Sequence, residues 1–348
     1  MIRSILRCAS NVAALLTLFA SPMPAVAKST HHSAHASSQK KTATHSESDK
    51  VFKQYASVFQ YDHTAPLSVV VTKTKRYPEC VMLRVNYASA NGERVPAIVF
   101  EPFRASRWHP VPAIILLHGL GGSKEDLVPF GHFLAATGYA SLIIDEYGHG
   151  ERKQEGQSAD TSDSIRGFQQ TVIDVRRGLD YLQTRPHISP HRIGILGFSL
   201  GAILAADVMG VDWRLRSGVF ISGGGNVGVI LKHLSEISPQ IRDRVAGVNW
   251  QLANVLLSGV DPLTFAAHIG ARPVLMQNGD ADHIVVPDCA KALYRAIALG
   301  KKSHVEIDWC RGCGHTLPLG RIYPHMRVWL DKNLKGEMTD ADTEILGR

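Results

Sequence analysis

The chain lacks long hydrophobic runs and blocks of basic residues. Its most apolar early stretch, Val12–Ala20, falls well short of the ~20 residues that a membrane-spanning helix needs. No lysine–arginine block is longer than a pair, and no basic stripe is interleaved with aromatic residues. We therefore expect neither nucleic acid nor stable membrane insertion, and the net charge of +7 over 348 residues is better explained by solubility than by a partner.

Cysteine is also scarce, with five residues in the chain. One Cys-x-x-Cys pair occurs at Cys310 and Cys313, but no second pair exists to complete a closed metal site, so no metal is expected. The four cysteines that follow residue 27 allow three disulfide pairings, which the sequence cannot rank. A local or long-range disulfide is expected rather than free thiols. The cysteines concerned are Cys80, Cys289, Cys310 and Cys313.

Residues 1–27 have the pattern of a secretory signal peptide. Arg3 and Arg7 precede the apolar stretch, Ala25-Val26-Ala27 supplies small residues for cleavage, and no acidic residue is present. We expect cleavage after Ala27 and export to the periplasm or the medium. Without the two arginines the formal charge falls from +7 to +5.

Residues 28–50 are rich in Ser, Thr, Ala, Lys and His and have almost no large apolar side chain, which predicts a disordered linker. His31, His32, His35 and His45 could bind a metal loosely, but a solvated tail is the simpler interpretation. From residue 51 to about 340 the composition is that of one globular domain.

Strand-like and helix-like segments alternate through this domain. Val81–Tyr87 and Val95–Glu101 flank Asn91-Gly92, which predicts a β-hairpin. The alternation after the hairpin predicts an α/β fold with a mostly parallel, doubly wound sheet and helices on both faces. Further strands are expected at 113–117, 139–144, 192–196, 218–221, 273–277 and 305–309, and helices at 126–137, 165–184, 202–209, 287–298 and 323–333.

The motif Gly197-Phe198-Ser199-Leu200-Gly201 lies between the apolar strand-like run 192–196 and the helix-like run 202–209. A serine on a sharp strand-to-helix turn has a strained backbone, and only small neighbours let the chain double back closely enough to expose its hydroxyl. The pattern nominates Ser199 as a nucleophile.

Three more motifs follow expected strands. They are the glycine-rich loop His118-Gly119-Leu120-Gly121-Gly122, the acidic loop 279–287 with Asp280 and Asp282, and the loop Cys313-Gly314-His315-Thr316. The chain order Ser199, Asp282, His315 is typical of one class of serine hydrolase.

Together these motifs resemble the α/β-hydrolase family, most closely its dienelactone-hydrolase-like and small-ester esterase branch, over roughly residues 81–334. The resemblance implies that His315 is the general base for Ser199 and that Asp282 orients it, with Asp280 as the alternative acid. It also implies an oxyanion hole formed by the backbone N–H groups of Leu120 and Leu200.

Other residues near these motifs receive weaker assignments. Tyr147, in the loop 145–152, is a candidate substrate contact, whereas His118 is expected to be structural and His283 a bystander. Ordinary surface or core roles are expected for His268, His304 and His325.

Residues 222–270 interrupt the alternation. Ile241, Val245, Val248, Leu252 and Val255 recur at spacings of four, three, four and three, which predicts a single apolar helical stripe. The segment is either an ordinary core-facing helix or a small cap over the active site. Within it, Asp261-Pro262 has the pattern of a helix N-cap followed by proline at the first helical position.

These expectations favour an exported serine hydrolase that cleaves a small carboxylic ester through an acyl-enzyme, without a cofactor. A thioesterase, lactonase or peptidase with the same triad remains open, as does a non-catalytic binding protein, and the oligomeric state is undetermined. Dienelactone hydrolases themselves use a cysteine nucleophile, so their particular reaction does not transfer to a chain with Ser199. The sequence before Val81 is too short for the β-propeller of prolyl-oligopeptidase-like peptidases.

Overall fold

The structure, a computed structural model, describes residues 50–153 and 161–336. The predicted signal peptide and all of the predicted linker except Lys50 lie outside these ranges. Within them, no helix combines the length and the apolar character needed to cross a bilayer.

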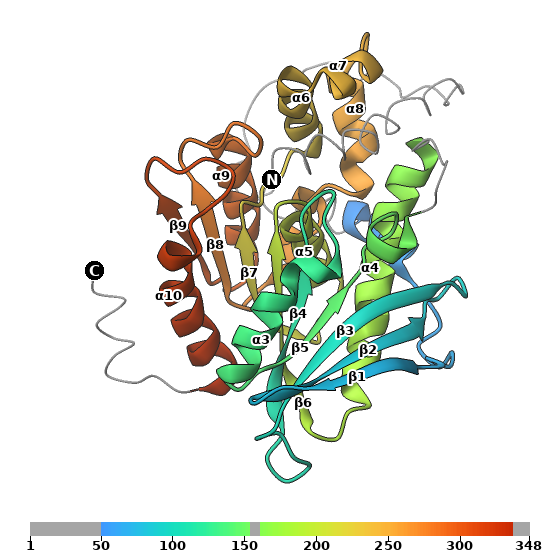
Figure 1. The fold of residues 1–348 in the computed structure, drawn as a ribbon. Coiled ribbons are helices and arrows are strands. Elements are labelled where there is room, and N and C mark those ends of the chain that lie inside the picture. Colours follow the sequence, from blue (N-terminus) through green and yellow to red (C-terminus); the bar gives the residue numbers. More distant parts are fainter. Residues whose placement is uncertain (1–49, 154–160, 337–348) are drawn as a thin grey trace.

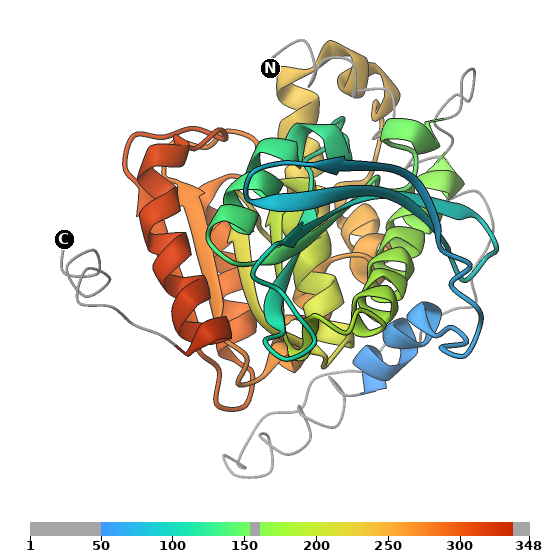
Figure 2. The ribbon, with the colours of Figure 1, turned by 60° about the horizontal axis from the view of Figure 1, so that its bottom comes forward.

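In the described part of the chain, one mixed sheet of nine strands lies at the centre, in the order β1-β2-β3-β5-β4-β6-β7-β8-β9 (Figure 1). The pairs β1–β2, β2–β3 and β3–β5 are antiparallel, and the remaining pairs are parallel. The right-handed twist of sheets accumulates across it, so the first strands cross the direction of the parallel ones (Figure 2). The strands are β1 Val70–Arg76, β2 Cys80–Ala88, β3 Arg94–Pro102, β4 Val111–Leu117, β5 Ala140–Ile144, β6 Ile188–Phe198, β7 Leu215–Ile221, β8 Val274–Gly279 and β9 Val305–Cys310.

Helices cover both faces of the sheet, as the alternation predicts. In β4, Ile115 and Leu117 point into a core shared with α4, α5 and α9, whereas Ile114 and Leu116 point into a second core with α3 and α10. Both faces of the central strands are apolar because both are buried. The helices are α3 Val128–Ala136, α4 Thr161–Gln183, α5 Leu200–Val211, α9 Pro287–Ala298 and α10 Leu319–Leu330.

Outside residues 222–270, the strand and helix predictions from residue 81 onward are confirmed in type, and α9 has the predicted bounds. The hairpin is also confirmed, with Val81 opposite Glu101 and Gly92 at a φ of +84° in the turn. The elements missed from the sequence include a helix at residues 50–56 and strand β1. All seven residues of β1 are exposed, so this edge strand carries no buried alternation that a sequence pattern could reveal.

The segment 222–270 forms three helices, α6 Val227–Ile237, α7 Pro239–Arg244 and α8 Trp250–Leu256, followed by 3₁₀ turns (Figure 1). The prediction of one continuous stripe over 241–255 is wrong. Gly247 has a φ of +80° and Asn249 caps a new helix, so α7 and α8 are separate. As a result Leu252 and Val255 are 48% and 63% exposed.

The helix start predicted at Asp261-Pro262 is confirmed. Asp261 caps the 3₁₀ turn Pro262–Thr264 by accepting the N–H of Leu263 at 3.0 Å. The same carboxylate accepts the N–H groups of Asn226 and Val227, which stand at the start of α6. One side chain therefore holds the two ends of the segment together.

Candidate active site

Ser199 occupies a strained turn between β6 and α5. Its φ of 54° and ψ of −114° are rare for a residue with a side chain, and its N–H donates to the Ile221 carbonyl of β7 at 2.8 Å. A Cβ at Gly201 would lie 2.5 Å from the Leu117 carbonyl oxygen of β4, and one at Gly197 would collide with Gly201. The two glycines of the motif are therefore required by close backbone contact, and the turn presents Ser199 at the carboxyl edge of the sheet.

Two further predicted residues lie in a hydrogen-bonded row with Ser199. His315 Nε2 is 2.8 Å from Ser199 Oγ, and His315 Nδ1 is 2.8 Å from Asp282 Oδ2. The Asp282 carboxylate is buried, and its other oxygen accepts the N–H groups of Ile284 and Val285. A carboxylate surrounded by donors places the proton of the neutral imidazole on Nδ1, which leaves Nε2 free to accept the serine proton.

Asp280, the alternative acid, has a different partner. Its carboxylate accepts the Gly312 N–H at 2.6 Å. Of the two aspartates in the loop after β8, Asp282 is therefore the one that contacts His315.

The loops that carry Asp282 and His315 are tied to each other. Cys310 and Cys313 form a disulfide, and the Cys313 carbonyl accepts the Ala281 N–H at 3.0 Å. Ser222, after β7, donates its hydroxyl to the His315 carbonyl at 2.8 Å. A disulfide is thus present in its local form, and these bonds fix the backbone on both sides of the histidine.

Cys80 and Cys289 are free and buried. The expectation of a disulfide rather than free thiols is met for one pair of cysteines and wrong for the other.

The two predicted oxyanion donors lie on segments next to Ser199. Leu200 is the first residue of α5, where backbone N–H groups have no partner within the helix. The loop after β4 passes close by, since a Cβ at Gly119 would lie 3.5 Å from Ser199 Cβ. Leu120 follows in that loop, which is turned back by a 3.0 Å bond from the Gly122 N–H to the Gly119 carbonyl.

His118 anchors the base of this loop. Its Nε2 accepts the Glu146 N–H at 3.3 Å and its Nδ1 lies 2.9 Å from the Gly119 carbonyl oxygen, so the proton resides on Nδ1. Burial lowers the pKa of His118 to about 4, and burial raises the pKa of the Glu146 carboxyl well above its ordinary value. Burial thus disfavours the charged form of both side chains, and His118 contributes structure to the loop.

Sequence reasoning missed Lys124, which is almost fully buried behind the same loop. Its ammonium is 2.5 Å from Asp145 Oδ2 and 2.6 Å from Glu151 Oε1, and Asp145 also accepts the N–H groups of Lys124 and Glu151. A buried lysine requires such a partner, but no local spacing connects residues 124 and 145. This pair joins the loop after β4 to the loop after β5.

Tyr147 is half-buried in that second loop, with its N–H bonded to Thr171 Oγ1 at 3.1 Å and its ring 5.1 Å from the Arg152 guanidinium. Its contact with substrate remains a prediction.

The remaining histidines singled out in the sequence lie apart from Ser199 in their contacts. His268 stacks on Phe52, His304 pairs with Glu306, and His325 pairs with Asp308. His283 is exposed.

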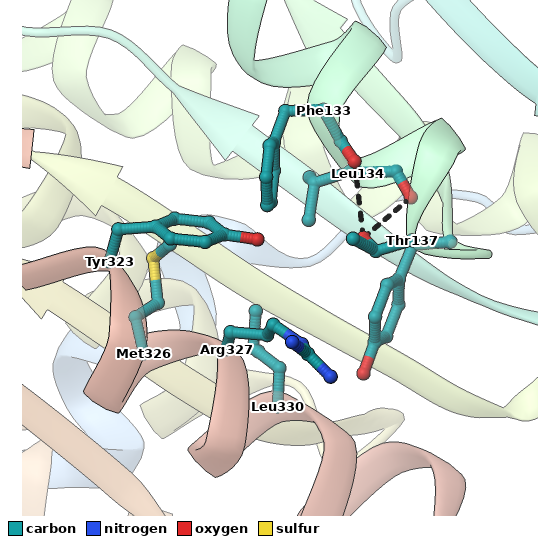
Figure 3. Close-up of a pocket in the computed structure, with 8 residues that line it drawn as sticks. Phe133, Leu134, Thr137, Tyr323, Met326, Arg327 and Leu330 are labelled. Atoms are coloured by element: carbon teal, nitrogen blue, oxygen red, sulfur yellow. Dashed lines mark hydrogen bonds between the residues drawn. The ribbon is translucent and has the colours of Figure 1, made fainter. Parts of the chain in front are cut away.

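A crevice between α3 and α10 contains none of the predicted site residues (Figure 3). It has no room for a water-sized molecule, and Thr137 on its wall bonds back to the carbonyls of Phe133 and Leu134. We regard it as a packing gap between two helices. It is lined by Phe133, Leu134, Thr137, Tyr139, Tyr323, Met326, Arg327 and Leu330.

The chain and its fold are similar to those of known proteins. The model of the dienelactone hydrolase family matches residues 95–318. Acetyl xylan esterase 1 from Thermoanaerobacterium sp. JW/SL YS485 superposes with a TM-score of 0.67 over 82% of this chain and 93% of that chain, at 17% identity. At that identity the likeness shows the fold alone, and the fold is that of the α/β-hydrolases.

Three curated relatives from Bacillus subtilis (strain 168) are 25–26% identical to the chain. The putative hydrolase YtaP aligns over 43% of this chain and 56% of its own length, and the uncharacterized peptidase YuxL over 72% and 39%. The putative esterase YitV aligns over 64% of this chain and 86% of its own length. The chain therefore spans about half of the length of YtaP and less than half of the length of YuxL.

The close contact at the serine turn predicts the effect of a single methyl group. Gly201→Ala should lower the free energy of unfolding by about 1–3 kcal/mol, because its Cβ would press on the carbonyls of Leu117 and His118. Gly320→Ala in α10 is the matched control: its Cβ would meet open space, and we expect no loss or a gain of about 0.5 kcal/mol. Urea denaturation measures both, and equal stability of the two variants would contradict the contact.

The neutral His118 predicts a pH dependence of stability. Its pKa is about 4 in the folded state and 6.5 as the ordinary value, so the unfolded chain binds the extra proton first as the pH falls. The contribution of neutral His118 to the free energy of unfolding is fully present above pH 6.5. It should decline by up to about 3 kcal/mol as the pH falls from 6.5 to 4. Urea denaturation gives the free energy of unfolding at pH 7 and at pH 4.5. The difference between these two values should be smaller for His118→Gln than for the wild type, and identical differences would refute this prediction.

Proposed function

We propose that this chain, which belongs to the dienelactone hydrolase family, is a serine hydrolase that cleaves a small carboxylic ester through an acyl-enzyme on Ser199. The main support is the continuous row of hydrogen bonds from Asp282 through His315 to Ser199, with 2.8 Å at each step. A serine alone is a weak nucleophile at neutral pH, and this row supplies the base that activates it.

In the proposed reaction, His315 Nε2 takes the proton of Ser199 Oγ as the oxygen attacks the carbonyl carbon of the ester. The negative charge that develops on the carbonyl oxygen is stabilised by the N–H groups of Leu120 and Leu200, at typically ~3–4 kcal/mol for each donor. Protonated His315, supported by Asp282, then gives its proton to the leaving alcohol. Water, activated by the same histidine, attacks the acyl-enzyme and releases the acid.

The substrate class is inferred from the segment 222–270 and from the relatives. Helices α6 and α8 pack into a small core that includes Leu231, Leu234 and Ala253, with Leu120 at its border. We infer that this segment forms a small cap that limits the acyl group and that Tyr147 contacts the substrate. YitV and acetyl xylan esterase 1 bear the names of esterases, which supports a small ester over a long-chain triglyceride.

A second candidate function is peptide hydrolysis, because YuxL is named a peptidase and aligns with 72% of this chain. The same triad also permits thioester and lactone cleavage. A panel of p-nitrophenyl esters, acyl thioesters, lactones and aminoacyl amides at matched concentration separates these activities. We expect the highest kcat/KM with short-chain esters.

Export is part of the proposal. Residues 1–27 have the signal-peptide pattern, and the Cys310–Cys313 disulfide is typical of an oxidising compartment. On expression of the full chain in a bacterial host, intact-mass measurement should give a periplasmic or extracellular product that begins at Lys28. A cytoplasmic product that retains residues 1–27 would contradict export.

The proposed roles predict distinct losses of activity. Ser199→Ala should lower kcat for p-nitrophenyl acetate by about 10⁴-fold or more, because no other oxygen replaces the nucleophile. Asp282→Asn should lower it by about 10³–10⁴-fold, because the amide favours the wrong imidazole tautomer. Asp280→Asn, two residues away, is the matched control and should stay within a few-fold of the wild type.

Unfolding midpoints of these three variants should match that of the wild type. Activity that persists in Ser199→Ala would reject the acyl-enzyme, and a larger loss in Asp280→Asn than in Asp282→Asn would reassign the acid.

A further inference from the structure

A second group of reactive side chains lies where the turn between β1 and β2 meets α3 (Figures 1 and 2). Glu79, Cys80 and His132 each offer one potential ligand atom, and the three atoms lie within 4.8 Å of one another. Glu79 Oε1 is 2.6 Å from His132 Nδ1 and 3.7 Å from Cys80 Sγ. The proposed hydrolysis makes no use of any of the three residues.

The backbone holds the two adjacent residues of this group in place. Cys80 is the first residue of β2 and pairs with Pro102 of β3, and its carbonyl accepts the Tyr77 N–H at 2.9 Å. The Glu79 carbonyl accepts the Phe103 N–H at 3.2 Å. These bonds fix the backbone from which the carboxylate and the thiol project.

The third residue comes from the helix and is held by aromatic contacts. The His132 ring stands edge-on to the rings of Tyr77 and Phe100, at centroid distances of 4.2 and 4.8 Å. These contacts keep the ring against the sheet. The group therefore joins two elements that are more than fifty residues apart in the chain.

Oxygen, nitrogen and sulfur donors in one group suit a divalent metal of intermediate softness. Thiolate and imidazole ligands favour Zn²⁺, whereas Mg²⁺ and Ca²⁺ prefer oxygen alone. We propose that Glu79, Cys80 and His132 bind Zn²⁺, with water as the fourth ligand, and that the ion ties the β1–β2 turn to α3. The sequence predicts no metal, because its Cys-x-x-Cys pair has no second pair and the histidines before residue 50 are better explained by a solvated tail; the Cys-x-x-Cys pair forms a disulfide in the structure.

Two of the ligand distances can be compared with those of a tetrahedral zinc site. With Zn–O and Zn–N bonds of about 2.0 Å and a Zn–S bond of about 2.3 Å, the oxygen and sulfur stand about 3.5 Å apart, close to the 3.7 Å observed here. The oxygen and nitrogen must separate from 2.6 Å to about 3.3 Å as the metal replaces their hydrogen bond. The side chains of Glu79 and His132 are 28% and 26% exposed, which gives them room to move, whereas Cys80 is buried.

Binding requires the thiol to become a thiolate, and its proton passes to the solvent. Without metal, Glu79 and His132 form a partly exposed hydrogen-bonded pair next to a buried thiol. A bond between the metal and the Cys80 sulfur therefore distinguishes a zinc site from a metal-free pair of Glu79 and His132.

Cobalt binding to the full-length protein, first treated with EDTA, tests this bond directly. Co²⁺ takes zinc-like sites and produces a thiolate-to-metal absorption band in the near ultraviolet. We expect the band at one equivalent of Co²⁺ in the wild type and its loss on addition of ZnCl₂. It should persist in Cys289→Ser, which removes the other free thiol of the described residues, and vanish in Cys80→Ser.

A second readout covers the case in which Cys80→Ser does not fold. In His132→Gln the thiol is intact, and we expect at least about tenfold weaker binding of Co²⁺, since even the loss of a residue behind a ligand costs that much. His325→Gln, which also removes a histidine paired with a carboxylate, should bind like the wild type. ZnCl₂ should raise the unfolding midpoint of the wild type but not of His132→Gln.

Three results would overturn the proposal: no near-ultraviolet band in the wild type, a band that survives in folded Cys80→Ser, or unchanged affinity in His132→Gln. If the protein bound Zn²⁺ but gave no thiolate band with Co²⁺, we would assign the zinc to the histidines of the N-terminal segment. That result would also exclude the proposed site. The histidines are His31, His32, His35 and His45.

Discussion

The rest of the site depends on the close approach of the Ser199 turn to strand β4. Gly201 lies so near the Leu117 carbonyl that a methyl group would not fit, and Gly197 lies equally near Gly201. Strain at Ser199 is tolerated because the turn is held on both sides, by the Ile221 carbonyl of β7 and by the start of α5. This packing brings the serine hydroxyl, the first N–H of the helix and the loop after β4 to one point at the edge of the sheet.

The remaining groups reach that point because parallel strands end at a common edge. Asp282 follows β8 and His315 follows β9, two adjacent strands, and the Cys310–Cys313 disulfide closes the second loop just before the histidine. On the other side, the buried Lys124–Asp145 pair and neutral His118 hold the loop that contains Leu120. The buried charged groups Lys124, Asp145 and Asp282 each have hydrogen-bond partners, which is what a low-dielectric interior requires.

Much of the fold and most of the candidate site could be predicted because their signals are local. A buried parallel strand is a short apolar run, a hairpin has Asn-Gly at its turn, and a strand-to-helix turn needs glycine two residues before and after the serine. Failures occurred where such a signal was absent or misleading. Strand β1 is exposed on both faces, and the apolar spacing over 241–255 continued across Gly247, whose left-handed backbone separates α7 from α8.

The sequence by itself determined the order of strands and helices along the chain, the serine turn with its glycines, and the loops in which an acid and a base had to lie. Only the tertiary structure decided which acid faces His315, which cysteines pair, and that Lys124 joins Asp145. The physical reason is that these contacts depend on how distant segments pack, for example the loops of Asp282 and His315 or those of Lys124 and Asp145. Asp280 and Asp282 are chemically identical and two positions apart, and the packing of β8 against β9 directs one toward the histidine and the other toward Gly312.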